Sequence, residues 1–276
     1  MSRRFSGSIF LLAMLCFALS LLAQGRAQSG LPGAKSIPDL SGIWEAPLEL
    51  PSGDRPQVDI CGEPSCAKLL GKPPMRDITL VEPQMLPWAE EKYMTAREGI
   101  QDPNSFGREE ANPYFSACTP LAPPALMLAT FNFFEIRQFP DVVLLLVGGL
   151  AGEADHTVRR IYLDGRGHPP DLRPTWMGHS TGRYEGDTLV VDTIGINDET
   201  WVDLQGHPHS DSLHLVERLR RVDQKSLEYE ATIDDPKAYK NTWKKKIVRG
   251  LAPPGPRFWD DALCEELLQI GTHYSK

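Results

Sequence analysis

The chain has 276 residues, among them 24 prolines and 23 glycines; 41% of its residues are hydrophobic and 24% are charged. This composition excludes a fibrous chain and leaves enough apolar side chains for a buried core. The 29 basic and 37 acidic side chains give a net charge of -8, which argues against a nucleic-acid partner. Beyond the N-terminal segment, no apolar run approaches the roughly 20 residues that a membrane span needs.

Residues 1–27 have the order of a secretory signal peptide. Arg3 and Arg4 precede an apolar run over residues 9–23, and small and polar residues follow up to Ala27. The run is short for a retained membrane anchor. We therefore expect cleavage after Ala27, a periplasmic or secreted mature protein, and no membrane span after cleavage. Cleavage would remove three arginines and no acidic residue, which makes the mature chain more acidic still.

Four cysteines remain after the signal segment, namely Cys61, Cys66, Cys118 and Cys264. In an oxidising compartment we expect them to form disulfide bonds, for which three pairings exist. One pairing closes the short loop between Cys61 and Cys66 and joins Cys118 to Cys264. Free buried thiols and a metal site are the alternatives, although zinc sites normally use a second close pair of cysteines, which this sequence lacks.

The mature chain is expected to be a linker over residues 28–38 followed by one domain over residues 39–276. Residues 50–125 are rich in proline and predict an extended wrap. Within the wrap, a helix is predicted over residues 87–99, because Pro87 can open a helix and Gly99 can close one. Residues 251–276 form a C-terminal segment.

From residue 130 to residue 250, apolar and polar residues alternate with period two, and turn residues recur about every eight to twelve positions. This pattern predicts strands over residues 42–44, 131–138, 142–147, 157–163, 176–184, 188–194, 213–222, 227–233 and 243–248. The predicted fold class is mainly β, an antiparallel meander that closes into a barrel because closure removes exposed strand edges.

Two resemblances accompany this prediction. Gly42-Ile43-Trp44 resembles the Gly-x-Trp opening of lipocalin-like, or calycin, barrels, which implies a barrel that holds a small apolar ligand. Residues 162–169 and 178–193, the latter reading GHSTGRYEGDTLVVDT, resemble the core of a large uncharacterised family of exported soil-bacterial proteins. This second resemblance extends from about residue 118 to residue 243; it implies export and no particular activity.

The segment Gly178-His179-Ser180-Thr181-Gly182 satisfies the Gly-x-Ser-x-Gly pattern of α/β-hydrolases, in which the serine is a nucleophile. In those enzymes a helix follows the serine, whereas here another predicted strand follows it. The alternative is that the two glycines mark a bent barrel strand where side chains must be small, and the context favours it.

His207-Pro208-His209, followed by His214 and Glu217, is the densest group of metal-ligating residue types. Imidazole and carboxylate ligands suit zinc, iron or manganese. In a strand over residues 213–222, His214 and Glu217 face opposite sides, so His207 and His209 are the candidate metal ligands. A polar loop at the barrel rim is the alternative.

Charged and aromatic residues in or beside the apolar strands complete the candidates. A charge inside a barrel should pair with another charge or contact a polar group of a ligand. An acid or an imidazole in such a pocket can also move a proton. The predicted catalytic residues are His179, Asp192 and Glu217. The predicted ligand-binding residues are Arg159, Trp176, Trp201 and His214.

Two functions therefore follow from the sequence. The first is an exported β-barrel that binds a small, largely apolar organic molecule, because a barrel of this size can enclose one. The alternative is a lyase, isomerase or hydrolase on the same barrel that uses histidine with Asp or Glu, with or without a bound metal. No motif identifies a cofactor, and the oligomeric state is left open.

Overall fold

Strands dominate the computed structural model, which describes residues 37–45, 78–81, 83–101, 119–129, 132–149 and 157–253. The strands of these residues are β1 (Gly42–Glu45), β2 (Ile78–Val81), β3 (Asn132–Gln138), β4 (Val142–Gly149), β5 (Thr157–Tyr162), β6 (His179–Glu185), β7 (Thr188–Ile194), β8 (His214–Arg221), β9 (Ser226–Asp234) and β10 (Trp243–Leu251). The helices among them are α3 (Pro87–Gln101) and α5 (Ala125–Leu128). The protein is mainly β, as the sequence predicts.

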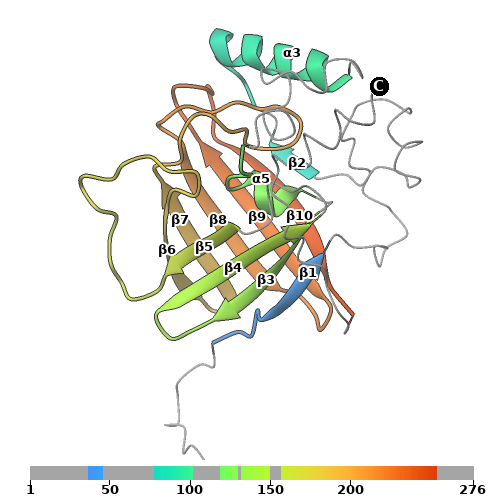
Figure 1. Ribbon diagram of the computed structural model, residues 1–276, viewed down its shortest axis with the longest axis vertical. Helices are drawn as coiled ribbons and strands as arrows, with labels where there is room; N and C mark the ends of the chain where they lie inside the picture. The colour runs from blue at the N-terminus through green and yellow to red at the C-terminus, as the bar shows by residue number, and fades with distance from the viewer. Residues whose placement is uncertain are drawn as a thin grey trace, which may run out of the picture. The chain divides into compact units, whose positions relative to one another are not determined.

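Nine of these strands close into a barrel (Figure 1). Neighbours follow the order β1, β3, β4, β5, β6, β7, β8, β9 and β10, and β1 pairs in turn with β10, where Trp44 lies opposite Leu251. β2 pairs with the same edge of β10 farther along the strand, at residues 244–246. The predicted barrel is therefore confirmed, and each of the nine predicted strands has its counterpart in it.

One pair of neighbours, β5 and β6, departs from the predicted antiparallel meander. These strands run parallel and share only two residue pairs, Ile161 with Ser180 and Tyr162 with Thr181. The cause is the long connection over residues 163–178, because a parallel pair needs a connection that carries the chain back before the next strand begins. The barrel is consequently mixed, and this junction is one of its two shortest, since β1 and β10 also share two residue pairs.

Alternate residues of the barrel strands point inward and form the core. In β9, Leu227, Tyr229, Ala231 and Ile233 are buried, while the residues between them are partly exposed. Strands β8 and β10 alternate in the same way. Each buried large apolar side chain stabilises the fold by about 1.5–3 kcal/mol. A slip of one residue would turn the outer polar residues inward, so the alternation fixes the register.

The barrel interior also holds part of the chain itself. Residues 121–129, which include α5, are all buried. The inward-facing Arg249 donates hydrogen bonds to the carbonyl oxygens of Met127 and Ala129 and to the side chain of Asn132, where Nη2 and Oδ1 are 2.9 Å apart. This segment therefore lies against the inner face of β10, which period-two alternation along the sequence does not reveal.

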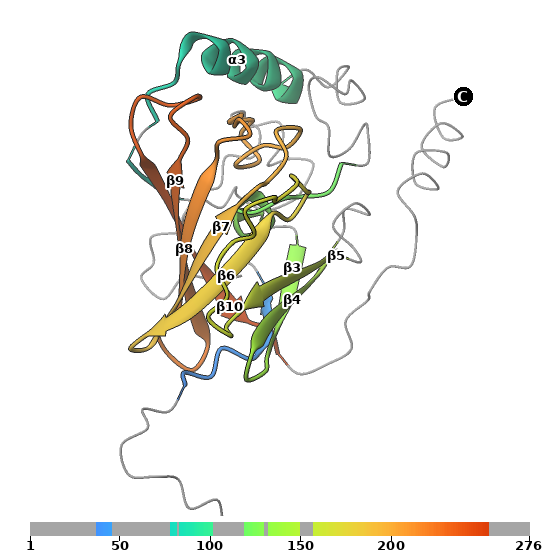
Figure 2. The ribbon, with the colours of Figure 1, turned by 90° about the vertical axis from the view of Figure 1, so that its left-hand side faces the viewer.

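Helix α3 and the loop over residues 195–213 lie at one end of the barrel (Figure 2). The backbone of Leu86, just before α3, donates to the carbonyl of Ala238 in the β9–β10 connection at 2.8 Å. Tyr93 of α3 stacks on His207 of the loop, with ring centroids 4.5 Å apart. The predicted helix is confirmed, starting at Pro87 and ending two residues later than predicted.

Several predictions lie outside the described residues. They are the signal peptide over residues 1–27, most of the linker over residues 28–38, most of the wrap over residues 50–125, nearly all of the C-terminal segment over residues 251–276, and the four cysteines Cys61, Cys66, Cys118 and Cys264. Within the described part of the chain, no helix is both long and apolar enough to cross a membrane.

Candidate functional site

Strand alternation separates the predicted site residues onto two faces of the barrel. Consecutive side chains of a strand point to opposite faces, so His179 of β6 lies on the outer wall and Ser180 on the inner. On β7, Asp192 is likewise outer and Thr193 inner, and Thr193 pairs in register with Ser180. One polar cluster therefore forms on the outer wall and a second inside the barrel.

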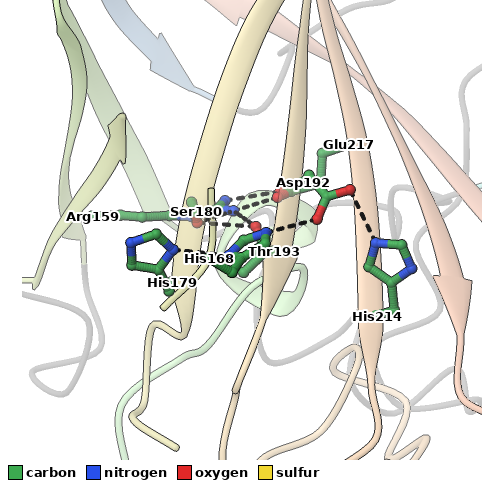
Figure 3. Close-up of polar contacts among 8 residues, drawn as sticks. All are labelled: Arg159, His168, His179, Ser180, Asp192, Thr193, His214 and Glu217. Atoms are coloured by element: carbon green, nitrogen blue, oxygen red, sulfur yellow. Dashed lines mark hydrogen bonds and ion pairs between the residues drawn. The ribbon is translucent and has the colours of Figure 1, made fainter. Parts of the chain in front are cut away.

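The outer cluster is a chain of three histidines and one aspartate (Figure 3). Nδ1 of His179 lies 2.8 Å from Nδ1 of His168, and Nε2 of His168 lies 2.9 Å from Oδ1 of Asp192. The other carboxylate oxygen, Oδ2, accepts from Nε2 of His214 at 3.0 Å. Asp192 therefore lies between the rings of His168 and His214, and His179 is the far end of the chain.

The connection over residues 163–178 brings His168 to this cluster. Its later part is fixed to the end of β7, because the backbone of Thr175 donates to the carbonyl of Gly195 at 2.9 Å. Gly195 has a φ of +71°, and a Cβ there would lie 2.5 Å from the side chain of Leu172. A side chain at this position would therefore push the loop away from the strand that carries Asp192.

Two pKa shifts define the electrostatics of the cluster. Partial burial acts to raise the pKa of Asp192, but the hydrogen bonds from His214 and His168 outweigh it and hold this pKa below its usual value. The pKa of His179 is lowered by desolvation first, then by the charges of His168 and Arg166. Near neutral pH the cluster therefore combines a carboxylate with a neutral His179.

The carboxylate determines which nitrogen carries each proton. An ionised carboxylate only accepts hydrogen bonds, so Nε2 of His168 must donate to it. When both imidazoles are neutral, Nδ1 of His168 is then an acceptor, and Nδ1 of His179 must donate to it. This leaves the lone pair of Nε2 of His179 available to take up a proton.

Aromatic and basic side chains border His179. The ring of Tyr162 stacks on it, with centroids 5.4 Å apart and planes inclined by 26°. The guanidinium of Arg166 lies over the Tyr162 ring, 4.0 Å from its centroid. Asp164 holds Arg166 in place through hydrogen bonds to Nε at 2.9 Å and to Nη2 at 2.5 Å.

The inner cluster is a fully paired network. Arg159 donates to both carboxylate oxygens of Glu217, to Ser180 at 3.1 Å and to Thr193 at 2.9 Å. Tyr229 donates to Glu217 at 2.8 Å. Burial acts to lower the pKa of Arg159, but Glu217 raises it beyond its usual value. Of the predicted residues, Arg159 and Glu217 thus bind each other inside the barrel, away from His179.

The Gly-x-Ser-x-Gly segment belongs to the bent strand and not to a nucleophile turn. Ser180 is buried and bonded within the inner network. A Cβ on Gly182 would lie 2.8 Å from the side chain of Ile161, and Gly178 has a φ of +62°. The two glycines are therefore required by close packing and backbone conformation, which is the alternative that the sequence context favours.

The predicted metal ligands occupy the loop over residues 195–213 and bind separate partners. Nδ1 of His207 lies 2.8 Å from Oδ2 of Asp203, and Lys245 pairs with the same carboxylate. His209 donates from Nδ1 to the carbonyl of Ser210 at 3.0 Å. Among the residues that the structure describes, no group of three or more histidine, cysteine, aspartate or glutamate side chains is placed to hold a metal ion.

The two predicted tryptophans lie in connecting segments, outside the named strands. Trp201 is buried in the hydrophobic core and forms an isolated bridge with Pro208. Trp176 is half-buried in the connection before β6.

The structure thus joins three predicted site residues, His179, Asp192 and His214, and adds His168, which is not among the predicted site residues. The tight turn after Glu185 could have revealed part of the cluster. It sets Thr181 opposite Asp192, so the outer residues His179 and Asp192 are diagonal neighbours. Nothing in the sequence indicated that His168 joins this cluster, because a long loop has no strand register that would fix its neighbours.

Comparison of the chain with models of protein families, with curated proteins and with solved structures finds no match. The function must therefore be argued from the geometry of the site.

Proposed function

We propose that the protein is an acid–base catalyst in which His179 is the general base and His168 and Asp192 form a proton relay. The observation that carries this proposal is the unbroken chain of contacts, 2.8 and 2.9 Å long, that joins the three side chains. A general base must be unprotonated at the working pH and within reach of the proton it takes. The lowered pKa of His179 and its available Nε2 meet the first condition.

In the proposed reaction, Nε2 of His179 takes a proton from a water molecule or from the substrate. The Nδ1 proton of His179 then moves to Nδ1 of His168, so the positive charge comes to lie beside Asp192. The carboxylate favours that charged form. Ser180 faces the interior, so water or a C–H bond of the substrate is the proton source, which fits a hydrolase, a lyase or an isomerase.

The geometry favours a relay over a shared metal ion. His168 contacts His179 through Nδ1 and Asp192 through Nε2, which lie on different edges of its ring. One metal ion cannot replace both contacts. A metal held by His207 and His209 stays a prediction of the sequence.

The signal-peptide pattern of residues 1–27 and the resemblance to exported soil-bacterial proteins support a periplasmic or secreted location for this catalyst. Binding of a small, largely apolar ligand inside the barrel also stays a prediction. Arg159, a predicted ligand-binding residue, is bonded to Glu217, a predicted catalytic residue, and residues 121–129 occupy part of the interior.

A screen of the purified protein against activated esters, lactones and compounds with an acidic C–H bond tests the proposal. Turnover should fall by about 100-fold or more in His179→Gln, because the base is lost. The wild-type rate should be level near neutral pH and decline only below pH 6.5, as His179 becomes protonated. The control is Arg183→Gln, an exposed arginine on the same strand.

Asp192→Asn provides the second variant, because an amide cannot stabilise a positive charge on His168. This variant should lower the rate of turnover, and it should change the pH at which that rate begins to decline. Turnover that is equal in wild type and His179→Gln would contradict the proposed function.

A further inference from the structure

We infer that the substrate of this site carries a carboxylate and that Arg166 binds it beside His179. The inference rests on the proposed function and adds the class of substrate. It starts from Arg166, whose guanidinium lies over the Tyr162 ring that stacks on His179.

Arg166 is held in place and still has donors to offer. Asp164 accepts from Nε and Nη2, and the guanidinium plane is 4.0 Å from the centroid of the Tyr162 ring. Nη1 has no hydrogen-bond partner among the described residues, and 49% of the side chain is exposed. Because the fold already holds the Arg166 side chain in place, less conformational entropy is lost when an anion binds. This favours binding.

The surrounding charges leave Arg166 as the group that an anion would meet. The carboxylate of Asp192 is bonded on both oxygens, by His168 and His214. Among the described residues, His168 and Tyr162 contact His179, while Arg166 lies over the Tyr162 ring and is paired with Asp164. Because the whole chain carries a net charge of -8, an anion needs such a local cation to bind.

A carboxylate fits the guanidinium because its two oxygens match two parallel N–H donors, and a phosphate can be bound in the same way. A carboxylate bound there would also lie near the imidazolium that forms when His179 takes up a proton. It would stabilise that state. Substrate binding and proton transfer would then support each other.

The test is an NMR titration of the histidine side chains of the mature protein with sodium acetate, at constant ionic strength set by sodium chloride. Acetate should raise the pKa of His179 in a saturable manner, because its negative charge favours the imidazolium. Arg166→Gln should weaken acetate binding by about tenfold or more, the equivalent of roughly 1.4 kcal/mol. Arg166→Lys keeps the charge and should retain part of the affinity.

Arg183→Gln is the matched control, since Arg183 is also an exposed arginine paired with a nearby carboxylate, Glu185. It should leave acetate binding unchanged. Equal acetate affinity in wild type and Arg166→Gln, or a shift that chloride alone reproduces, would overturn the carboxylate inference. The proposed function is tested separately in the same samples without acetate, where a His179 pKa at or above 6.5 would contradict it.

Discussion

At the scale of single residues, burial separates the histidines of this protein into two kinds. His179 lies at the surface end of a hydrogen-bonded chain, whereas His209 is almost entirely enclosed, with only 1% of its surface exposed. Nε2 of His209 is 2.8 Å from the hydroxyl of Thr200, and Nδ1 donates to a carbonyl. Both nitrogens of the neutral ring are therefore used in contacts within the fold.

Stability should fall as the pH drops because of His209. Desolvation lowers its pKa in the folded protein, although nearby acidic groups and the Ser210 carbonyl oppose the shift. The unfolded chain takes up a proton near pH 6.5, and the folded chain does so only at lower pH. The contribution of His209 to the free energy of unfolding is therefore at its maximum above pH 6.5. Below pH 6.5 it declines by up to about 1.4 kcal/mol per pH unit.

Urea unfolding of wild type and His209→Gln at pH 7.5, 6.5 and 5.5 checks this prediction. His179 contributes in the same direction in both proteins, so the difference between them isolates His209. The variant should be less stable at pH 7.5 and should lose less stability on acidification. Parallel profiles would show that His209 is not buried in its neutral form.

At the scale of the strands, the inner network supports the outer site. Arg159 extends from β5 to Ser180 on β6, to Thr193 on β7 and to Glu217 on β8. Since β5 and β6 share only two residue pairs, these side-chain contacts join the strands where backbone pairing is short. They also lie directly behind the strands that carry His179 and Asp192.

Arg159→Met should destabilise the protein by about 3–5 kcal/mol, because it leaves the Glu217 carboxylate buried without its cation. The double variant Arg159→Met, Glu217→Leu should recover part of that loss. Denaturant unfolding of the single and double variants measures the coupling. Hydrogen exchange should accelerate first in β5 and β6 of Arg159→Met. A change of under about 0.5 kcal/mol in the free energy of unfolding, in both Arg159→Met and the single variant Glu217→Leu, would contradict this role.

The success of sequence reasoning also differs between elements. The strands over residues 188–194 and 227–233 follow from local alternation and adjacent turns, and the structure places them nearly as predicted. The parallel β5–β6 pair does not follow, because it depends on the path of a long connection. Helix α5 is four residues long and buried on all sides, so it has no amphipathic pattern to detect.

At the scale of the whole molecule, the barrel serves as a rigid wall whose outer face carries the candidate site. The interior contains paired charges and the segment around α5, held by Arg249. The Gly-x-Trp opening and the strand count correctly predict a barrel, but they do not indicate which face is used. The face that is used depends on whether His179 and Asp192 occupy outward-facing or inward-facing positions of their strands. It also depends on the loop that brings His168 to them.

The central claim is that desolvation keeps His179 neutral and that Asp192, acting through His168, leaves the lone pair of His179 on Nε2. Long-range ¹H–¹⁵N NMR of the histidine side chains measures both the tautomer and the pKa of each ring. We predict a proton on Nε2 of His168, a proton on Nδ1 of His179, and a His179 pKa below 6.5. A His179 ring that carries its proton on Nε2 at neutral pH, or that titrates above 6.5, would contradict the account.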